Sequence, residues 1–161
     1  MCKITTAQVN KIIESYERDP QQLIAILLDI QSASEQNYVD KEWAEIVSRE
    51  LDIPLSKIYE ALTFYSMFSI TPRGKYIIEL CYSTPCYFLK GRELQDWVEA
   101  AAGIKLGETS ADRKITLQRT NCVGACDTGP VIKIGDEVFG NLTKEKVSEL
   151  IACCRKGQLN V

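Results

Sequence analysis

Hydrophobic positions in the first seventy residues recur with the spacing of helices. Val9, Ile12, Ile13 and Tyr16 follow the i, i+3, i+4, i+7 pattern of one amphipathic helix, and comparable segments follow at about 21–34, after residue 40 and after residue 54. Residues that cap or break helices separate these segments: Thr5 or Thr6, Asp19-Pro20, Asp40 and, in a first turn, Pro54. We therefore predict a small helical bundle over residues 1–70.

After residue 74 the pattern changes to short strands that alternate with helices. Strand-like runs cover 76–80, 115–119, 131–134 and 137–139, and the last two are joined by a hairpin turn at Gly135-Asp136. Helical spacing marks one segment that ends at Gly103 and a last helix that Thr143 caps. The order β-α-β-β-β-α suits a thioredoxin-like α/β domain over residues 71–161. The whole chain is thus predicted to be α/β, with an N-terminal helical bundle.

Composition places the chain among soluble globular proteins, with 45% hydrophobic and 25% charged residues in 161. The first residues lack the apolar stretch of a secretory signal, and the most apolar run, 23–30, is too short to cross a bilayer. We therefore expect a cytoplasmic protein without membrane insertion. A net charge of −3 argues against a nucleic-acid partner.

Cysteine and histidine content narrows the chemistry. In a reducing compartment, seven cysteines indicate metal binding or redox chemistry before disulfides. The sequence has no histidine, which excludes histidine general bases, Cys-His nucleophiles, zinc fingers with paired histidines and Rieske ligation. Any metal chemistry must rest on thiolates, and no catalytic residue is predicted.

Four cysteines form two close pairs, Cys81-x4-Cys86 and Cys122-x3-Cys126, separated by 35 residues. Each pair follows a predicted strand, where loops turn side chains toward one point. A [2Fe-2S] cluster needs two outside thiolates on each iron, which two pairs supply. Gly124 and Ala125 would let the backbone approach inorganic sulfur and donate N–H groups to it.

Other uses of these thiols remain open from spacing alone. A structural four-cysteine zinc site uses the same ligands, usually as C-x2-C pairs. A thiol-disulfide active site needs C-x-x-C, which the chain lacks. Lys90, Arg92 and Arg119 would either offset cluster charge or serve as solvated surface charge. We expect Cys154 to pack in the core, and Cys2 and Cys153 to be spare thiols.

Several stretches together resemble the small thioredoxin-like [2Fe-2S] subunit of bacterial NADH dehydrogenase (complex I) and of NAD(P)-linked hydrogenases, formate dehydrogenases and electron-bifurcating complexes. The likeness lies in Thr63-Phe64-Tyr65-Ser66-Met67-Phe68, in Pro72-Arg73-Gly74-Lys75-Tyr76, in Gly107-Glu108-Thr109, in Asn141-Leu142-Thr143 and in the two cysteine segments, 81–86 and 122–126. The chain departs from the family's usual Asp-Gly at Asp112-Arg113 and from its usual Ala-Pro at Gly129-Pro130.

This resemblance implies that Cys81, Cys86, Cys122 and Cys126 hold a [2Fe-2S] cluster close to the flavin of a larger partner that binds FMN and NAD(P)H. The chain itself shows no G-x-G-x-x-G segment and no P-loop. We expect an electron-transfer subunit without a substrate-converting site, working beside further iron–sulfur, hydrogenase or dehydrogenase subunits. A soluble bifurcating hydrogenase-type complex is the favoured host. The alternative is a structural interaction subunit with a zinc site, whose Phe64, Tyr65 and Phe68 dock a partner.

Overall fold

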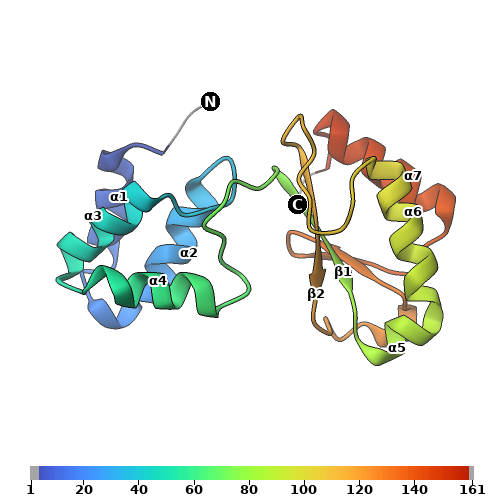
Figure 1. Ribbon diagram of the computed structural model, residues 1–161, viewed down its shortest axis with the longest axis horizontal. Coiled ribbons are helices and arrows are strands. Elements are labelled where there is room, and N and C mark those ends of the chain that lie inside the picture. Colours follow the sequence, from blue (N-terminus) through green and yellow to red (C-terminus); the bar gives the residue numbers. More distant parts are fainter. Residues whose placement is uncertain (1–3, 160–161) are drawn as a thin grey trace. The chain divides into compact units, whose positions relative to one another are not determined.

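A computed structural model describes residues 4–159 and divides the chain into two compact units, Met1–Arg73 and Gly74–Val161 (Figure 1). The first unit is helical and the second is a mixed sheet with helices, which confirms the predicted fold class. Within residues 4–159 no helix is both long enough and apolar enough to cross a membrane.

The first unit contains four α-helices and one 3-10 turn: α1 Thr6–Ser15, η1 Pro20–Gln22, α2 Leu23–Ala33, α3 Lys41–Leu51 and α4 Leu55–Phe64. Side chains cap the starts of α1 and α3 as predicted. Thr5 and Gln8 form a reciprocal capping box, and the Asp40 carboxylate accepts a hydrogen bond from the Glu42 N–H. Pro54 is the N-cap residue of α4, one position before the first turn predicted for it.

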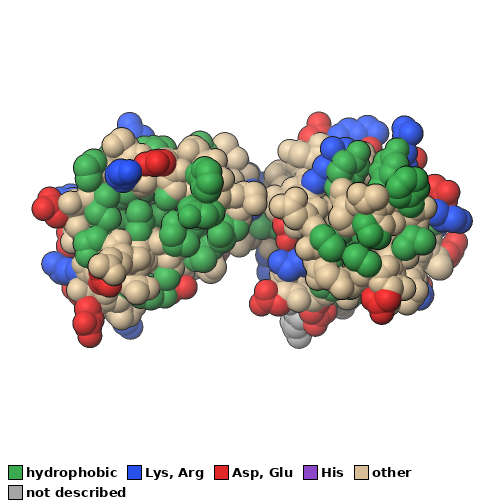
Figure 2. All heavy atoms as spheres, turned by 90° about the horizontal axis from the view of Figure 1, so that it is seen from below, with side chains coloured by type: hydrophobic (Ala, Val, Ile, Leu, Met, Phe, Trp, Pro, Cys, Tyr) green, Lys and Arg blue, Asp and Glu red, His purple; other side chains and the backbone are tan. Residues whose placement is uncertain are grey.

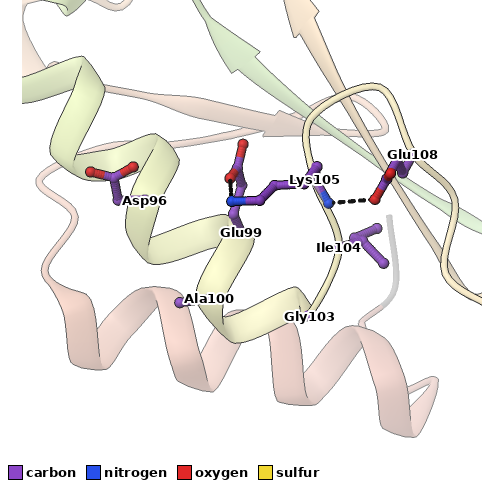
Figure 3. Close-up of a pocket in the computed structure, with 7 residues that line it drawn as sticks. All are labelled: Asp96, Glu99, Ala100, Gly103, Ile104, Lys105 and Glu108. Atoms are coloured by element: carbon purple, nitrogen blue, oxygen red, sulfur yellow. Dashed lines mark hydrogen bonds and ion pairs between the residues drawn. The ribbon is translucent and has the colours of Figure 1, made fainter.

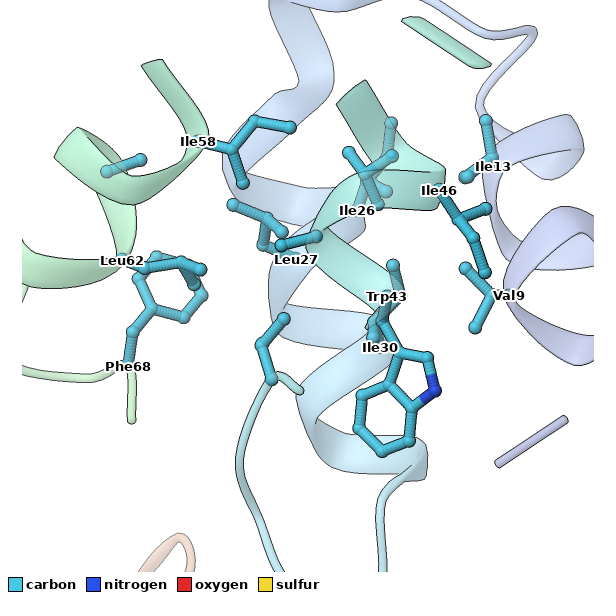
Figure 4. Packing of buried hydrophobic residues seen from close by; sticks show 14 of the residues in the cluster. Val9, Ile13, Ile26, Leu27, Ile30, Trp43, Ile46, Ile58, Leu62 and Phe68 are labelled. Atoms are coloured by element: carbon cyan, nitrogen blue, oxygen red, sulfur yellow. The ribbon is translucent and has the colours of Figure 1, made fainter. Parts of the chain in front are cut away.

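The core of this unit consists of the apolar faces of its helices. Figure 4 shows side chains from all four α-helices turned toward one another, and these residues belong to one buried cluster. Phe68 belongs to this core and is 7% exposed, whereas Phe64 and Tyr65 lie at the surface. The aromatic motif of residues 63–68 therefore divides between core packing and surface.

One buried amide fastens the segment after α4 to the core. The Gln31 side chain donates from Nε2 to the Met67 carbonyl at 2.9 Å, and its Oε1 accepts from the Ser69 N–H at 2.8 Å. Gln31 is 7% exposed, so its buried amide depends on these two backbone groups instead of water. These two bonds bring Phe68, which lies between them, against the helices.

The second unit has a four-stranded sheet in the order β2-β1-β3-β4. The strands are β1 Tyr76–Cys81, β2 Ile115–Thr120, β3 Ile132–Ile134 and β4 Glu137–Phe139. Strands β1 and β2 are parallel, with Cys81 opposite Thr120, and β3 runs antiparallel to β1. The crossover between the parallel strands contains α6 Arg92–Ala102, and α7 Lys144–Lys156 follows β4.

Helices α6 and α7 lie side by side on one face of this sheet (Figure 1). Their apolar side chains, Leu94 and Val98 from α6 and Val147 and Ile151 from α7, form one core with alternate residues of the strands. The intervening residue Glu79 points away from that core, where it accepts a hydrogen bond from Gln118 and pairs with Lys133. The strand alternation therefore fixes which face carries the helices.

The segment after β1 departs from the predicted pattern, and the turn before β2 has a conformation that is unusual for its residue. The chain after β1 enters a short helix, α5 Thr84–Cys86, and a π-helical turn, η2 Tyr87–Gly91, so Cys86 lies on a helix and the predicted loop is wrong there. Pro85, in the first turn of α5, favours this helical start. In the turn before β2, Arg113 has φ 53, the left-handed conformation that suits the family's usual glycine.

Cys154 lies in the core of the second unit, as predicted, with no exposed surface. Burial, with a smaller contribution from the neighbouring Cys153, raises the pKa of the Cys154 thiol to about 11. The fold therefore favours the neutral thiol. Cys153 is half-buried, and Cys2 lies outside the described residues.

Replacing Gln31 with leucine should destabilise the first unit by about 1–3 kcal/mol, because two partly buried hydrogen bonds, to the Met67 carbonyl and from the Ser69 N–H, are then lost. Urea unfolding followed by circular dichroism measures this. The matched control is Gln22→Leu, which changes an exposed glutamine and should alter stability by less than about 0.5 kcal/mol. Equal stability of the two variants would contradict the role given to Gln31.

Alkaline pH should destabilise the second unit through Cys154. Its pKa is raised above the ordinary 9.0, so its stabilising effect is complete below pH 9 and is lost as pH rises through about 11. Unfolding measured at pH 8 and pH 11 should show a loss that is roughly 1–2 kcal/mol larger in the wild type than in Cys154→Ala. The same pH response in both proteins would contradict burial of this thiol.

Candidate metal centre

The two cysteine segments meet because β1 and β2 are parallel neighbours. Cys81 is the last residue of β1 and pairs in register with Thr120, the last residue of β2. Parallel strands end at the same edge of a sheet, so Cys122, two residues beyond β2, emerges beside Cys81. The Tyr82 N–H donates to the Thr120 carbonyl at 3.1 Å and extends this pairing past the strand ends.

Short helical turns place the second cysteine of each segment. Cys86 is the last residue of α5, and Cys126 begins the 3-10 turn η3 Cys126–Thr128. Cys81 and Cys86 form a small buried cluster with Val131, against which Val123 and Ala125 pack. Residues that follow β2 and a residue that precedes β3 thus pack around Cys81 and Cys86.

The four thiols are arranged as two pairs. The Cys122 and Cys126 sulfurs are 3.6 Å apart, and Cys81 and Cys86 lie close enough for each to shift the pKa of the other. The two pairs also interact electrostatically, since Cys81 and Cys86 both act to raise the pKa of Cys126. Within residues 4–159, no three cysteine, aspartate or glutamate side chains converge closely enough to hold a single ion.

In the first pair the two thiols differ in acidity. Burial acts to raise the pKa of Cys81, but the combined effect of Ser83, Cys86 and the Val123 backbone outweighs it and leaves that pKa below its ordinary value. Burial is also the largest influence on Cys86, and there it prevails: with the added effect of Cys81, the pKa of Cys86 is raised.

The second pair repeats this division. The Gly124 N–H donates to the Cys122 sulfur and, with a bond from Cys126, lowers the pKa of Cys122. The bond with Cys122, followed by burial, raises the pKa of Cys126. The pKa shifts thus run in opposite directions within each pair, downward for Cys81 and Cys122 and upward for Cys86 and Cys126. Because thiolates are the metal ligands, a lowered pKa favours metal binding at Cys81 and Cys122.

Backbone N–H groups surround the sulfurs as the small residues suggested. Gly124 bonds to Cys122, Val123 to Cys81, and Val131 to Cys86. Gly124 has φ 87, a conformation that glycine adopts without strain and that aims its N–H back at Cys122. Donors of this kind stabilise negative charge on sulfur.

Exposure differs sharply between the pairs. Cys81 and Cys86 are buried, whereas Cys122 is exposed and Cys126 half-buried. Apolar side chains follow Cys81 at the surface: Tyr82 is 52% exposed and Phe88 79% exposed. Figure 2, which views the end of the second unit that carries α5, shows hydrophobic side chains at the surface with charged ones mostly toward the rim. The second pair therefore lies where a partner could approach it.

The three basic residues near the cysteine segments, Lys90, Arg92 and Arg119, lie at the protein surface or interact with surface side chains. Arg119 stacks over the Tyr82 ring, with 4.1 Å between its Cζ and the ring centroid. Lys90 pairs with Glu93 at 3.8 Å and is exposed. Arg92 begins α6 and is exposed too.

Ser83 is a site residue that sequence reasoning missed. Its Oγ lies 3.2 Å from the Cys81 sulfur, and its side chain also acts to lower the pKa of Cys86 and of Cys122. Its position two residues after a ligand candidate, ahead of Pro85, was the available signal. A serine at that point is equally suited to capping the next helix, so sequence alone did not distinguish the two uses.

A hollow lies away from these four cysteines, at the end of α6 (Figure 3). It has a volume of about 410 Å³, and its charged groups satisfy one another: Lys105 Nζ pairs with Glu99 at 2.7 Å, and the Lys105 N–H donates to Glu108 at 2.7 Å. Lys105, the largest influence, lowers the pKa of Glu99 through this bond. These contacts fasten the loop after α6 to the helix.

The donor set fits a two-iron cluster. It provides four thiols in two pairs, with backbone N–H groups that act to lower the pKa of Cys81 and of Cys122. Each iron of such a cluster takes two outside thiolates in tetrahedral sulfur coordination, which matches the pairing.

Comparison with known proteins agrees with this chemistry. The family model of the thioredoxin-like [2Fe-2S] ferredoxin matches residues 9–155. A subunit of the NADH-quinone oxidoreductase of Rickettsia felis is 38% identical over 125 residues, covering 78% of this chain and 75% of that protein. The HndA subunit of the NADP-reducing hydrogenase of Solidesulfovibrio fructosivorans is 28% identical over 145 residues, covering 90% of this chain and 84% of that protein.

Among solved structures, an NAD+-reducing [NiFe]-hydrogenase in the air-oxidized state superimposes with a TM-score of 0.75 and 23% identity. The match covers 88% of this chain and 24% of the hydrogenase chain, so this protein spans about a quarter of that chain's length. This likeness supports the fold.

The family match spans both the helical unit and the sheet unit. Proteins of this family bind a [2Fe-2S] cluster, the cofactor expected from the cysteines. The chain therefore belongs to the thioredoxin-like [2Fe-2S] ferredoxin family.

Proposed function

We propose that Cys81, Cys86, Cys122 and Cys126 are the ligands of the [2Fe-2S] cluster, and that the chain is an electron-transfer subunit. The observation that carries this proposal is the meeting of two thiol pairs at one edge of the sheet, in a chain of a [2Fe-2S] family. When bound, such a cluster supplies one-electron transfer.

The protein's own residues have distinct parts in this function. Cys81 and Cys86 anchor the inner side of the site in a buried cluster with Val131. Cys122 and Cys126 hold the outer side, on the segment after β2, where Cys122 reaches the surface. The N–H groups of Val123, Gly124 and Val131 stabilise sulfur charge. The inner pair fixes the site, and the outer pair opens it to a redox partner.

The partner that we propose is a flavoprotein subunit that binds FMN and NAD(P)H and exchanges single electrons with this chain. Two relatives are named as subunits, one of NADH-quinone oxidoreductase and one of an NADP-reducing hydrogenase. Their names support an NAD(P)-linked complex as the host. Of these hosts we favour a cytoplasmic, bifurcating hydrogenase-type complex with further iron–sulfur or hydrogenase subunits.

Iron analysis tests the ligand assignment. The full chain, purified without oxygen, should contain two irons and two sulfides and be red-brown, because four thiolates complete one [2Fe-2S] cluster. Cys122→Ala should lose iron and colour yet keep its circular dichroism spectrum, since Cys122 is exposed and contributes little to the core.

Cys153→Ala is the matched control, because Cys153 is half-buried and lies outside the proposed site. It should keep the full iron and sulfide content. A colourless, zinc-loaded wild type would favour the structural interaction subunit instead. Retention of the cluster in Cys122→Ala would refute the assignment of Cys122.

Purification from the native cells tests the proposed host. An affinity tag on the chain should recover a stoichiometric flavoprotein that contains FMN and is reduced by NADH or NADPH, because electron exchange requires a stable contact between the two redox centres. Mass spectrometry identifies the remaining subunits, and a hydrogenase subunit among them would select the favoured host. Recovery of the chain with proteins that bind neither flavin nor nicotinamide would contradict the proposed partner.

A further inference from the structure

Ser83 occupies a helix-capping position but does not cap. It precedes α5 with an extended backbone, φ −85 and ψ 160, which is the conformation of an N-cap residue. A serine there ordinarily accepts a hydrogen bond from an N–H of the first turn. The Ser83 side chain makes no capping bond to α5. Its hydroxyl is therefore available for another partner.

That partner is sulfur. The Ser83 Oγ lies 3.2 Å from the Cys81 Sγ, and the Ser83 side chain also acts to lower the pKa of Cys86 and of Cys122. The hydroxyl therefore contacts Cys81 directly and influences a sulfur of each pair. The Ser83 backbone likewise acts to lower the pKa of Cys81.

The direction of the hydrogen bond follows from the chemistry of a ligand. A thiolate sulfur has no proton to give, so in a loaded site Ser83 must be the donor. A donated hydrogen bond stabilises sulfur more strongly as its negative charge grows, which favours the reduced state. Hydrogen bonds to the sulfurs are one of the factors that set the potential of an iron–sulfur centre.

We propose that the Ser83 hydroxyl donates a hydrogen bond to a ligand sulfur and raises the reduction potential of the centre. Ser83 is a positioning residue: it acts through the cysteine ligands and binds no iron. The inference rests on the proposed ligand assignment. Nearby backbone donors at Val123, Gly124 and Val131 act in the same direction, so Ser83 supplies one part of the total.

The test is a redox titration of the full chain, followed by visible absorbance and electron paramagnetic resonance, for wild type, Ser83→Ala and Ser83→Thr. Loss of the hydroxyl should make the potential more negative, lowering the equilibrium constant for reduction by about threefold to tenfold, the range expected for one hydrogen bond. Tenfold corresponds to 59 mV for a one-electron couple. Ser83→Thr keeps the hydroxyl and should restore most of the shift.

Thr84→Val is the matched control, since it removes an exposed hydroxyl one residue along the chain and should leave the potential unchanged. Iron and sulfide content of the wild type tests the ligand proposal separately from the potential. With equal cluster content, an unshifted potential in Ser83→Ala, or an equal shift in Thr84→Val, would overturn the inference. Failure of both Ser83→Ala and Ser83→Gly to assemble a cluster would overturn it as well, because the hydroxyl would then be needed to build the site.

Discussion

Parallel pairing of β1 and β2 is the constraint on which the rest of the site depends. The two strands share one register, and both end at the same edge of the sheet, with Cys81 opposite Thr120. In the sequence, 35 residues separate Cys86 from Cys122, and the strand pairing brings the two cysteine segments next to each other. The α6 crossover that parallel strands require also supplies half of the helical cover, and its apolar face packs with α7 against the same strands. Fold and site are thus set by one pairing.

The site built on this edge is asymmetric. Its inner pair is enclosed with Val131, and its outer pair reaches the surface near exposed aromatic side chains. Burial opposes charge on the inner thiols, and hydrogen bonds from Ser83 and the backbone oppose that effect at Cys81. The local structure thus counteracts the cost of placing anionic sulfur in a partly apolar setting. An electron carrier needs both properties, a shielded anchor and an accessible side.

Sequence periodicity predicted most helices and strands correctly, because each had its own hydrophobic spacing and its own capping or turn residues. Thr5, Asp40 and Thr143 cap helices as predicted, and Gly103 ends α6 in a left-handed conformation. The errors lie where local signals compete. Residues 84–91 form helical turns because Pro85 starts a helix, whereas the cysteine spacing suggested a loop. The role of Ser83 could not be predicted, since only the folded chain shows that its hydroxyl turns from the helix to sulfur. Spacing alone also could not give the number of metal ions, because four cysteines can bind either one zinc ion or two irons.

Two irons held between two pairs of thiolates have a spectroscopic signature that a zinc site or a mononuclear iron site lacks. Mössbauer spectroscopy of the iron-57-labelled full chain, before and after one-electron reduction, detects it. In the oxidised protein all the iron should be high-spin ferric in tetrahedral sulfur coordination, with the two ions coupled to a diamagnetic state, and one-electron reduction should give equal amounts of ferric and ferrous iron. A paramagnetic ferric centre in the oxidised protein, or iron with oxygen or nitrogen ligands, would contradict a two-iron centre on these four cysteines.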